Sequence, residues 1–355
     1  MKQNPLDTMD LRNRVATVLT TFVSSHRLDM EQISVDTLPL VDSLAELLEG
    51  GKRLRPAFAY WGYRAAGGSD TSEVVSACAS LEFLQACALI HDDVMDASDT
   101  RRGKPAAHKQ FENLHVRNQW SGSSVDFGIG SAILIGDLAL SWADELLLTS
   151  GLDNEQIARA KKIYDEMRTE LMAGQYLDLL EQVRGNITVE RAATVIKYKS
   201  AKYTIERPLL MGAAIAGSSE SISKALSDYG LALGEAFQLR DDVLGVFGDQ
   251  ATTGKPAGDD LREGKQTMLV AHAFSLATTP QLALLNSSLG DAELSAESIE
   301  QLQQMLITCG SLDLVEKQIS EKTMAATNAI EVIDIPDEAR FALHELAIMA
   351  TRRAS

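Results

Sequence analysis

Proline is absent from a long central part of this chain. All eight prolines lie outside the stretch between Pro105 and Pro208, so helices can run through it without a helix-breaking residue. Apolar residues from Ile157 to Leu171 recur at three- and four-residue steps, which is the period of an amphipathic helix. Aromatic residues make up only 5% of the chain and alternating β-branched runs do not recur, so strand signals are scarce. The sequence predicts an all-α helical bundle.

We expect a single domain over residues 1–355. Glycine-rich and polar stretches predict breaks between helices rather than disordered linkers. These breaks are 67–70, 118–130, 217–221, 249–264 and 278–295. The last one is expected to precede a C-terminal helical pair at about 296–355, which a capping box from Ser298 to Gln301 would open.

The formal net charge of the chain is -17, so most of its surface would repel the backbone of a nucleic acid. The first residues lack the apolar core of a signal peptide, and no uncharged apolar run approaches the roughly 18 residues of a membrane span. We therefore expect a cytoplasmic protein with no membrane span and no nucleic-acid partner. Cys78, Cys87 and Cys309 lack the spacing of metal ligands and are expected to be buried hydrophobes without a redox role.

Two similar acidic motifs lie far apart in the sequence. Asp92-Asp-Val-Met-Asp96 follows an apolar run, and its four-residue spacing puts Asp92 and Asp96 on one helix face. Such carboxylates repel unless a cation is present, and Mg²⁺ takes carboxylates plus substrate phosphates as ligands. Asp241-Asp242 also ends an apolar helix. One motif alone is equally well a solvated helix end, but two of them in a bundle can face each other across a central cavity and clamp a diphosphate.

Cationic and polar side chains near both motifs suit phosphate ligands. Arginine offers a planar fork to phosphate oxygens and lysine offers a point charge. Each of these residues alone is more often an ordinary surface group, so the set matters as a whole. The set comprises Lys52, Arg53, Arg55, Arg101, Arg102, Lys199, Ser200, Gln238, Lys255 and Lys265.

At these residues the sequence resembles the trans-isoprenyl diphosphate synthase (polyprenyl synthetase) family, and most of all its geranylgeranyl diphosphate synthases. The matching segments run in the family's order from about Gly50 to Lys265. They are GGKRLRP, DDVMD followed by RRG, FG with ILIGD, KS in place of KT, FQLRDD and GKPAGDDLREGKQT. The resemblance implies the isoprenoid synthase fold, a homodimer, isopentenyl and allylic diphosphates as substrates, and Mg²⁺ as cofactor, with three ions when substrate is bound.

The resemblance also implies roles for individual residues. The isopentenyl diphosphate would be held by Lys52, Arg55, Gln85 and Arg102. Magnesium would be bound by Asp92, Asp96 and Asp241, with Asp93 and Asp242 as supporting carboxylates. Contacts to the allylic diphosphate would come from Arg101, Lys199, Ser200, Gln238, Lys255 and Lys265.

Two positions depart from the family's pattern. Gly245 stands where the second motif commonly has its last aspartate, and Asp249, one turn beyond, is a candidate to compensate. Ser200 replaces the usual threonine and keeps its hydroxyl. Because Asp241 is retained, we expect activity.

The implied chemistry is ionisation of an allylic C–O bond, attack of the isopentenyl double bond on the allylic cation, and loss of a proton. No Ser/His/Asp or Cys/His nucleophile set is recognisable, and His91 is expected to be a packed or supporting group. A class I terpene cyclase is a weaker alternative because it does not need GGKRLRP. An inactive regulatory subunit is weaker because both acidic motifs are recognisable.

Product length is expected to depend on the helix before Asp92, along which the growing tail runs away from the diphosphate. One turn below lie the small Cys87 and Ala88, and two turns below lie Phe83 and Leu84, each turn about 5.4 Å deeper. Phe83 is the first aromatic that can close the tunnel, which favours a C20 product, geranylgeranyl diphosphate, over farnesyl or longer products. The alternative is that Phe83 packs in ordinary core and another helix forms the floor.

Overall fold

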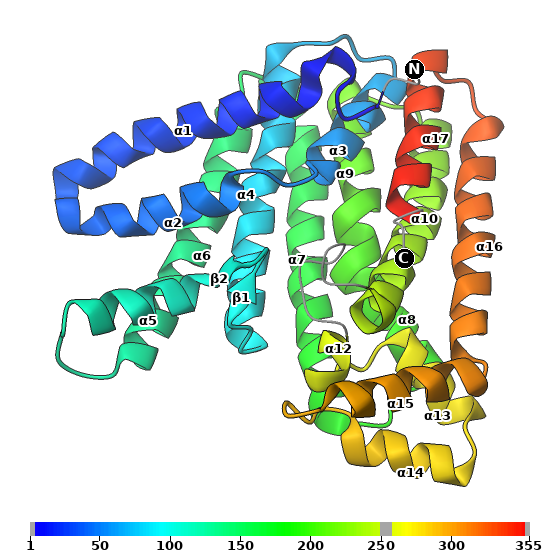
Figure 1. Ribbon diagram of the computed structural model, residues 1–355. Coiled ribbons are helices and arrows are strands. Elements are labelled where there is room, and N and C mark those ends of the chain that lie inside the picture. Colours follow the sequence, from blue (N-terminus) through cyan, green and yellow to red (C-terminus); the bar gives the residue numbers. More distant parts are fainter. Residues whose placement is uncertain (1–3, 249–257, 352–355) are drawn as a thin grey trace. The chain divides into compact units, whose positions relative to one another are not determined.

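The computed structural model describes residues 4–248 and 258–351. Within these residues the only strands are β1 (Thr100–Arg101) and β2 (Lys104–Pro105), which pair as a short antiparallel hairpin. All other regular structure there is helical, which confirms the all-α prediction (Figure 1). The chain groups into two compact units, which are described separately. Unit 1 comprises Met1–Tyr60 and Gly68–Ala158, and unit 2 comprises Trp61–Gly67 and Arg159–Ser355.

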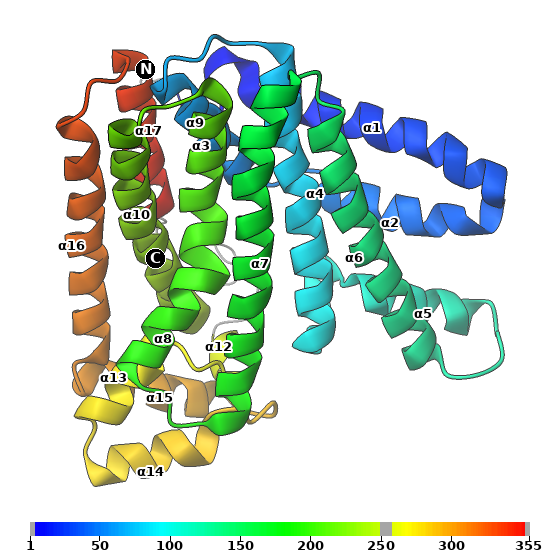
Figure 2. The same cartoon turned by 180° about the vertical axis from the view of Figure 1, so that it is seen from behind.

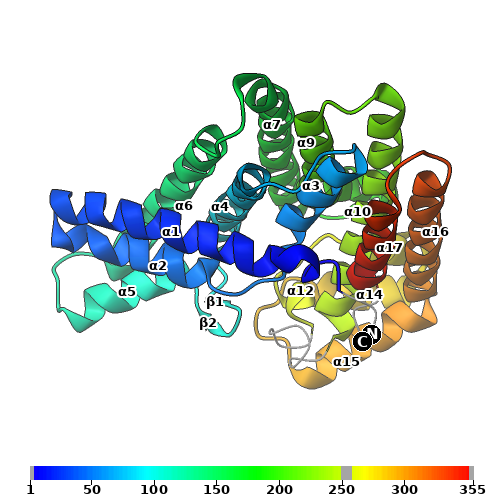
Figure 3. The same ribbon diagram turned by 90° about the horizontal axis from the view of Figure 1, so that it is seen from above.

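Unit 1 is organised around one long apolar helix. Its elements are η1 (Thr8–Asp10), α1 (Leu11–Ile33), η2 (Val35–Thr37), α2 (Leu38–Leu48), the first part of α3 (Leu54–Ala65), α4 (Ser72–Met95), the β1–β2 hairpin, α5 (Ala107–Arg117), α6 (Ser124–Leu148) and the start of α7 (Asn154–Arg184). Helices α1 and α2 lie side by side (Figure 3), and α4 contacts α1, α2, α5 and α6. Because α4 is buried along most of its length, its C-terminal acidic motif has a fixed position.

Unit 2 contains the rest of α7 and a long helix whose middle segment is π-helical. Helix α8 (Val189–Val195), the π-helical η3 (Ile196–Glu206) and α9 (Arg207–Ala216) follow one another without a break (Figure 2). The helices that follow α10 (Glu220–Phe247) in sequence are α12 (Asp259–Arg262), α13 (Met268–Leu276), α14 (Thr279–Ser288), α15 (Ala296–Thr308), α16 (Ser311–Glu331) and α17 (Asp337–Thr351). Helix α10 contacts η3 and α9, and, among the helices that follow it in sequence, α12, α13, α16 and α17.

Helix boundaries differ from the expected ones at the C-terminal side. The stretch expected as a break at 278–295 contains α14, where Gln281 Oε1 accepts a hydrogen bond from the Thr278 N–H at 2.9 Å. Three helices, not a pair, occupy the end of the chain. The capping box expected at Ser298 is wrong, because the N-cap of α15 is Ser295, whose hydroxyl accepts from the Ser298 N–H at 3.1 Å. Pro280 lies in the first turn of α14, a position that tolerates proline.

Two other helices bear on the sequence-based expectations. Helix α6 begins at Ser124, inside the expected break at 118–130, because Ser123 caps it. Among the described residues, α4 and α6 are long and apolar enough to cross a membrane by length and composition. The apolar window of α4 is 72% buried, which is typical of a core helix, whereas that of α6 is only 33% buried.

Candidate active site

The first acidic motif lies at the C-terminal end of α4, as predicted. Asp96 is the C-cap, and its N–H donates to the carbonyl of Asp92 at 2.8 Å, so both carboxylates share one face and are half-buried. Asp93 points elsewhere and is 3% exposed. Arg101 donates to Asp93 through Nε at 2.9 Å and through Nη2. Asp93 is therefore engaged by an arginine, which fits the supporting role that the resemblance implies.

The β1–β2 hairpin positions the two arginines that follow the motif. Both central residues of its two-residue turn have positive φ, 54° at Arg102 and 75° at Gly103, as a type I′ turn requires. Arg101 on β1 reaches Asp93, while Arg102 Nη1 donates to the carbonyl of Leu47 at 3.2 Å. Partial burial lowers the pKa of Arg102, and the charge of Glu82 opposes this.

The loop from Glu49 to Arg53 and the first turn of α3 carry the other cations of unit 1 that are candidates for phosphate binding. Lys52 is exposed and Arg55 is half-buried in the first turn of α3, whereas Arg53 between them is buried. A pocket of about 300 Å³ lies beside this loop, and Gly50, Gly51 and Arg102 are among its lining residues. Of the residues expected to hold isopentenyl diphosphate, Arg102 lines this pocket, whereas Lys52, Arg55 and Gln85 are not among its lining residues.

One arrangement of side chains resembles the catalytic triad of a cysteine nucleophile but cannot act as one. It consists of Cys87, His91 and Asp137. Cys87 Sγ lies 3.8 Å from His91 Nδ1, and His91 Nε2 lies 3.8 Å from Asp137 Oδ1. Burial, and then the charge of Asp137, raise the pKa of the Cys87 thiol to about 12, so the thiolate is scarcely populated at neutral pH. His91 Nε2 also lies 3.1 Å from the Ile133 carbonyl. His91 is therefore a packed group, as expected.

The residues proposed to set product length do not share one face of α4. Ala88 is half-buried and lies one turn before Asp92. Phe83 lies nine residues before Asp92, which is about 180° away around a helix. Its fully buried ring packs on Phe22 and Trp142, with centroids 5.2 and 6.0 Å apart. This packing favours the alternative in which Phe83 belongs to ordinary core. Leu84 and Cys87 are buried as well.

The second acidic motif lies inside α10, not at its end, because the helix continues to Phe247. Gln238 Nε2 donates to Asp242 Oδ1 at 2.7 Å, one turn along the helix. Burial, and then the charges of Asp260, Asp241 and Asp178, raise the pKa of Asp242 to about 8, against the Gln238 hydrogen bond. The charged form of Asp242 is therefore disfavoured, mainly because the side chain is buried.

Asp260 accounts for the departure at Gly245. A Cβ atom added at Gly245 would lie 1.9 Å from Asp260 Oδ2, so no other residue fits there while Asp260 keeps its place. Gly245 is one turn after Asp241 and shares its face. The carboxylate of Asp260, from α12, thus lies where the motif's usual last aspartate would begin. The Nζ atom of Lys265 lies 3.7 Å from Oδ1 of Asp260. Asp249, the other candidate, falls outside the described residues, as does Lys255.

Lys199 and Ser200 lie in the π-helical segment η3. Lys199 Nζ lies 2.6 Å from Oδ2 of Asp178 on α7. The two helices meet at Gly174, where an added Cβ would lie 2.3 Å from the Lys199 backbone nitrogen. π-Helical turns occur often at functional sites. Asp178 and Asp260 were not assigned roles from the sequence. Asp260 lies in the matching segment GKPAGDDLREGKQT, which could have singled it out, whereas the signal for Asp178 is its proximity to Lys199 in the fold.

The donor set fits magnesium held together with a diphosphate. Among the described residues, no three His, Cys, Asp or Glu side chains converge as a preformed metal cage. This agrees with Mg²⁺, which is usually held by one or two carboxylates, waters and substrate phosphates. A cation bound beside Asp242 would favour its charged form, which burial and then the neighbouring carboxylates disfavour. Whether the motifs of the two units meet at one cavity stays a prediction.

Two carboxylate motifs and several cations on a helical fold are typical of enzymes that bind diphosphates together with metal ions. A sequence profile described as polyprenyl synthetase matches residues 39–306, and the chain belongs to this family. It is therefore a trans-prenyl diphosphate synthase of a magnesium-dependent family, not a terpene cyclase.

Known relatives differ in product. The short chain isoprenyl diphosphate synthase of Methanothermobacter thermautotrophicus is 33% identical over 86% of this chain and 87% of its own. Octaprenyl diphosphate synthase of Escherichia coli is 31% identical over 91% of this chain and 93% of its own. The crystal structure of geranylgeranyl pyrophosphate synthase of Corynebacterium glutamicum, complexed with isoprenyl diphosphate and magnesium, superposes with a TM-score of 0.94 at 42% identity, covering 97% and 99%.

Proposed function

We propose that this chain is a geranylgeranyl diphosphate synthase that extends allylic diphosphates with isopentenyl diphosphate to C20. The observation that supports this length is the small, half-buried Ala88 one turn before Asp92, which leaves the first level of the tail path open. The likeness to the Corynebacterium enzyme supports it as well. Chromatography of the products from labelled isopentenyl diphosphate with C5, C10 and C15 primers tests it; a main product other than C20 contradicts it.

The residues divide into groups with different tasks. Isopentenyl diphosphate is bound by Lys52, Arg55, Gln85 and Arg102, and the pocket lined by Gly50, Gly51 and Arg102 supports this assignment for Arg102. Asp92, Asp96 and Asp241 bind Mg²⁺, three ions in the substrate complex, while Asp93 and Asp242 support them. The allylic diphosphate is contacted by Arg101, Lys199, Ser200, Gln238, Lys265 and Lys255.

In this proposal the residues of the chain bind the two substrates, orient them, and neutralise the charge of their diphosphates. Magnesium, when bound, stabilises the negative charge that grows on the leaving diphosphate. Lys199 exchanges its ion pair with Asp178 for a phosphate oxygen, and Arg101 stays oriented by Asp93. The allylic C–O bond breaks with its electron pair on the diphosphate. The isopentenyl double bond forms the new C–C bond, and the released diphosphate takes the proton.

Replacing Lys52 or Arg55 by alanine is expected to raise the KM for isopentenyl diphosphate about 10-fold or more, the scale of one lost charge-assisted hydrogen bond. The KM for the allylic primer should change little, because these cations serve one diphosphate only. Steady-state kinetics with each substrate varied in turn provides the measurement. Equal effects on both substrates would refute this division of the cations.

Replacing Ala88 by phenylalanine is expected to shorten the main product to C15 or below, because the ring would block the tail path one turn below Asp92. Product chromatography decides this, and Ala88→Ser serves as the control that adds little volume. An unchanged C20 product from Ala88→Phe would show that this helix does not line the path. Phe83→Ala should instead lower stability by about 3–5 kcal/mol, the cost of emptying an aromatic core site.

We also propose a cytoplasmic homodimer built as one polyprenyl synthetase domain. Helix α6 supports the dimer, because its apolar window is mostly unburied in the single chain. Ile133 and Leu134 are 44% and 60% exposed on it. Large exposed apolar patches mark protein or membrane contacts, and a second copy of the chain would cover this one.

A further inference from the structure

The loop between α2 and α3 holds its shape against an unfavourable backbone conformation. Arg53 has a φ of +53°, in the left-handed region that a side chain with a Cβ rarely adopts. Gly50 and Gly51, with φ of +78° and +86°, adopt positive values without such strain. A strained residue persists only where its surroundings fix it, and such strain gathers at functional sites.

The side chain of Arg53 supplies that fixation. It is 7% exposed, although its neighbour Lys52 is exposed and Arg55 is half-buried. Its Nη1 donates to the carboxylate of Glu82 and its Nη2 to the carbonyl of Leu48, both at short distance. The middle cation of the loop thus turns inward, while those on either side stay accessible.

Glu82 is a carboxylate in an otherwise apolar part of α4. It is 8% exposed between Leu81 and Phe83, which are fully buried. A buried charge is costly unless it is paired, so a carboxylate at this position depends on Arg53. Glu82 lies three residues before Gln85 on the same helix, so the two side chains project from adjacent turns. Its charge also opposes the lowering of the Arg102 pKa that partial burial causes.

We propose that the Arg53–Glu82 pair positions the isopentenyl diphosphate site without touching the substrate. It joins the loop that presents Lys52 and Arg55 to the helix that presents Gln85. This inference rests on the proposed role of those residues. Arginine suits the task because its fork engages a carboxylate and a carbonyl together, which a lysine ammonium cannot do in the same geometry.

The test is Glu82→Gln, which keeps the volume and removes the charge. We expect the KM for isopentenyl diphosphate to rise at least about 10-fold, with kcat and the KM for the allylic primer within about 2-fold, the pattern of lost ground-state binding. Arg53→Lys should give a smaller rise of the same kind. It also serves as the deciding variant if Glu82→Gln does not fold.

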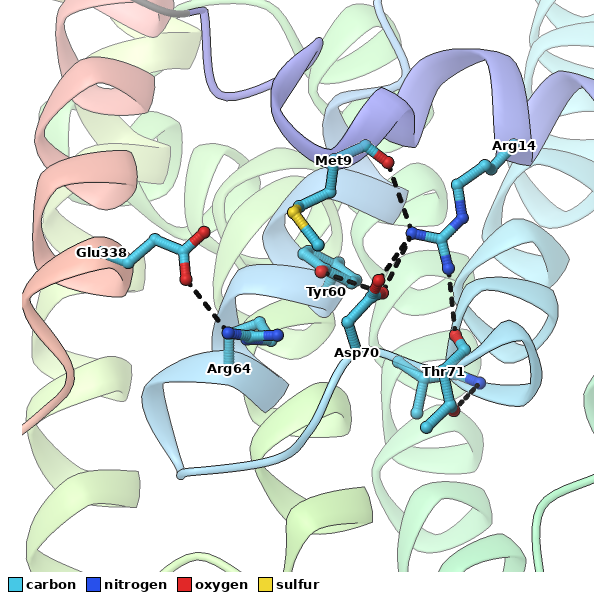
Figure 4. Close-up of polar contacts among 8 residues, drawn as sticks. Met9, Arg14, Tyr60, Arg64, Asp70, Thr71 and Glu338 are labelled. Atoms are coloured by element: carbon cyan, nitrogen blue, oxygen red, sulfur yellow. Dashed lines mark hydrogen bonds and ion pairs between the residues drawn. The ribbon is translucent and has the colours of Figure 1, made fainter.

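Asp70→Asn is the matched control for general loss of stability. Asp70 forms an ion pair with Arg14 of the same unit, at 2.9 Å to Nη1, and accepts from the Tyr60 hydroxyl at 3.0 Å (Figure 4). The variant should lower the melting temperature and leave the KM for isopentenyl diphosphate unchanged. A shift of this KM in the control equal to that in Glu82→Gln would overturn the positioning role.

Two failures can be told apart. If Lys52→Ala raises the KM for isopentenyl diphosphate and the folded Glu82→Gln and Arg53→Lys variants do not, the positioning inference is wrong and the binding site stands. If Lys52→Ala also leaves this KM unchanged, the assignment of the binding site itself is wrong.

Discussion

Replacing Asp92 or Asp241 by alanine is expected to lower kcat by about 10²–10³ or more, the effect of removing one preorganised contact to developing charge. Each carboxylate is proposed to bind Mg²⁺, and neighbouring carboxylates raise the pKa of Asp242 beside Asp241, in addition to the larger effect of burial. Single-turnover rates with saturating substrates and Mg²⁺ provide the measurement. A chelator should abolish the activity of the unmodified protein, and added Mg²⁺ should restore it.

Asp228→Ala is the control for that experiment. Asp228 lies on α10 with Asp241, but its side chain is 53% exposed and pairs with Lys224 one turn away, at 2.8 Å. Its loss should leave kcat unchanged, because an exposed ion pair of this kind contributes little. Near-normal turnover of a folded Asp92→Ala or Asp241→Ala variant contradicts the metal assignment.

Introducing the family's usual aspartate, as Gly245→Asp, is expected to reduce turnover by about 10²-fold instead of improving it, the effect of misplacing catalytic groups by about 1 Å. The new Cβ would lie 1.9 Å from Asp260 Oδ2, so the carboxylate of Asp260 must leave its place. Two carboxylates would also compete for one space beside Asp241. Kinetics on the purified variant and its thermal melting separate loss of activity from loss of folding.

A double variant sharpens this prediction. Gly245→Asp with Asp260→Gly moves the carboxylate from α12 to α10 and removes the clash. It should recover at least part of the activity that Gly245→Asp loses. If Gly245→Asp alone is as active as the unmodified protein, Asp260 does not occupy that space. If the double variant is no better than the single one, the clash is not the cause of the loss.

The sequence predicted the features that depend on local pattern. The helix of α4 and the pairing of Asp92 with Asp96 follow from apolar periodicity and four-residue spacing, and both are confirmed. The family follows from short motifs and is confirmed as well. Where the pattern was ambiguous, as at Pro280 in α14, a helix was read as a break.

Features that depend on contacts between distant segments could not be predicted. The pair of Arg53 with Glu82 joins a loop to another helix, and nothing in either segment alone indicates it. Asp260 meets Gly245 only because α12 packs on α10. The error at Phe83 had another cause. Counting helical turns gave its distance from Asp92 along the helix axis, but it ignored that Phe83 lies on the opposite face of the helix from Asp92.

The burial of two cysteines also decides how the protein can be labelled chemically. Burial raises the pKa of Cys78 far above its usual range and that of Cys87 to about 12, so at neutral pH only about one Cys87 thiol in 10⁵ is a thiolate. Maleimides and similar reagents should therefore leave both residues unmodified in the native state. Once Cys309 is replaced by serine, a cysteine introduced on any exposed helix becomes the reactive thiol. A fluorescent dye or spin label can then be attached at one chosen position without removing Cys87 from beside His91.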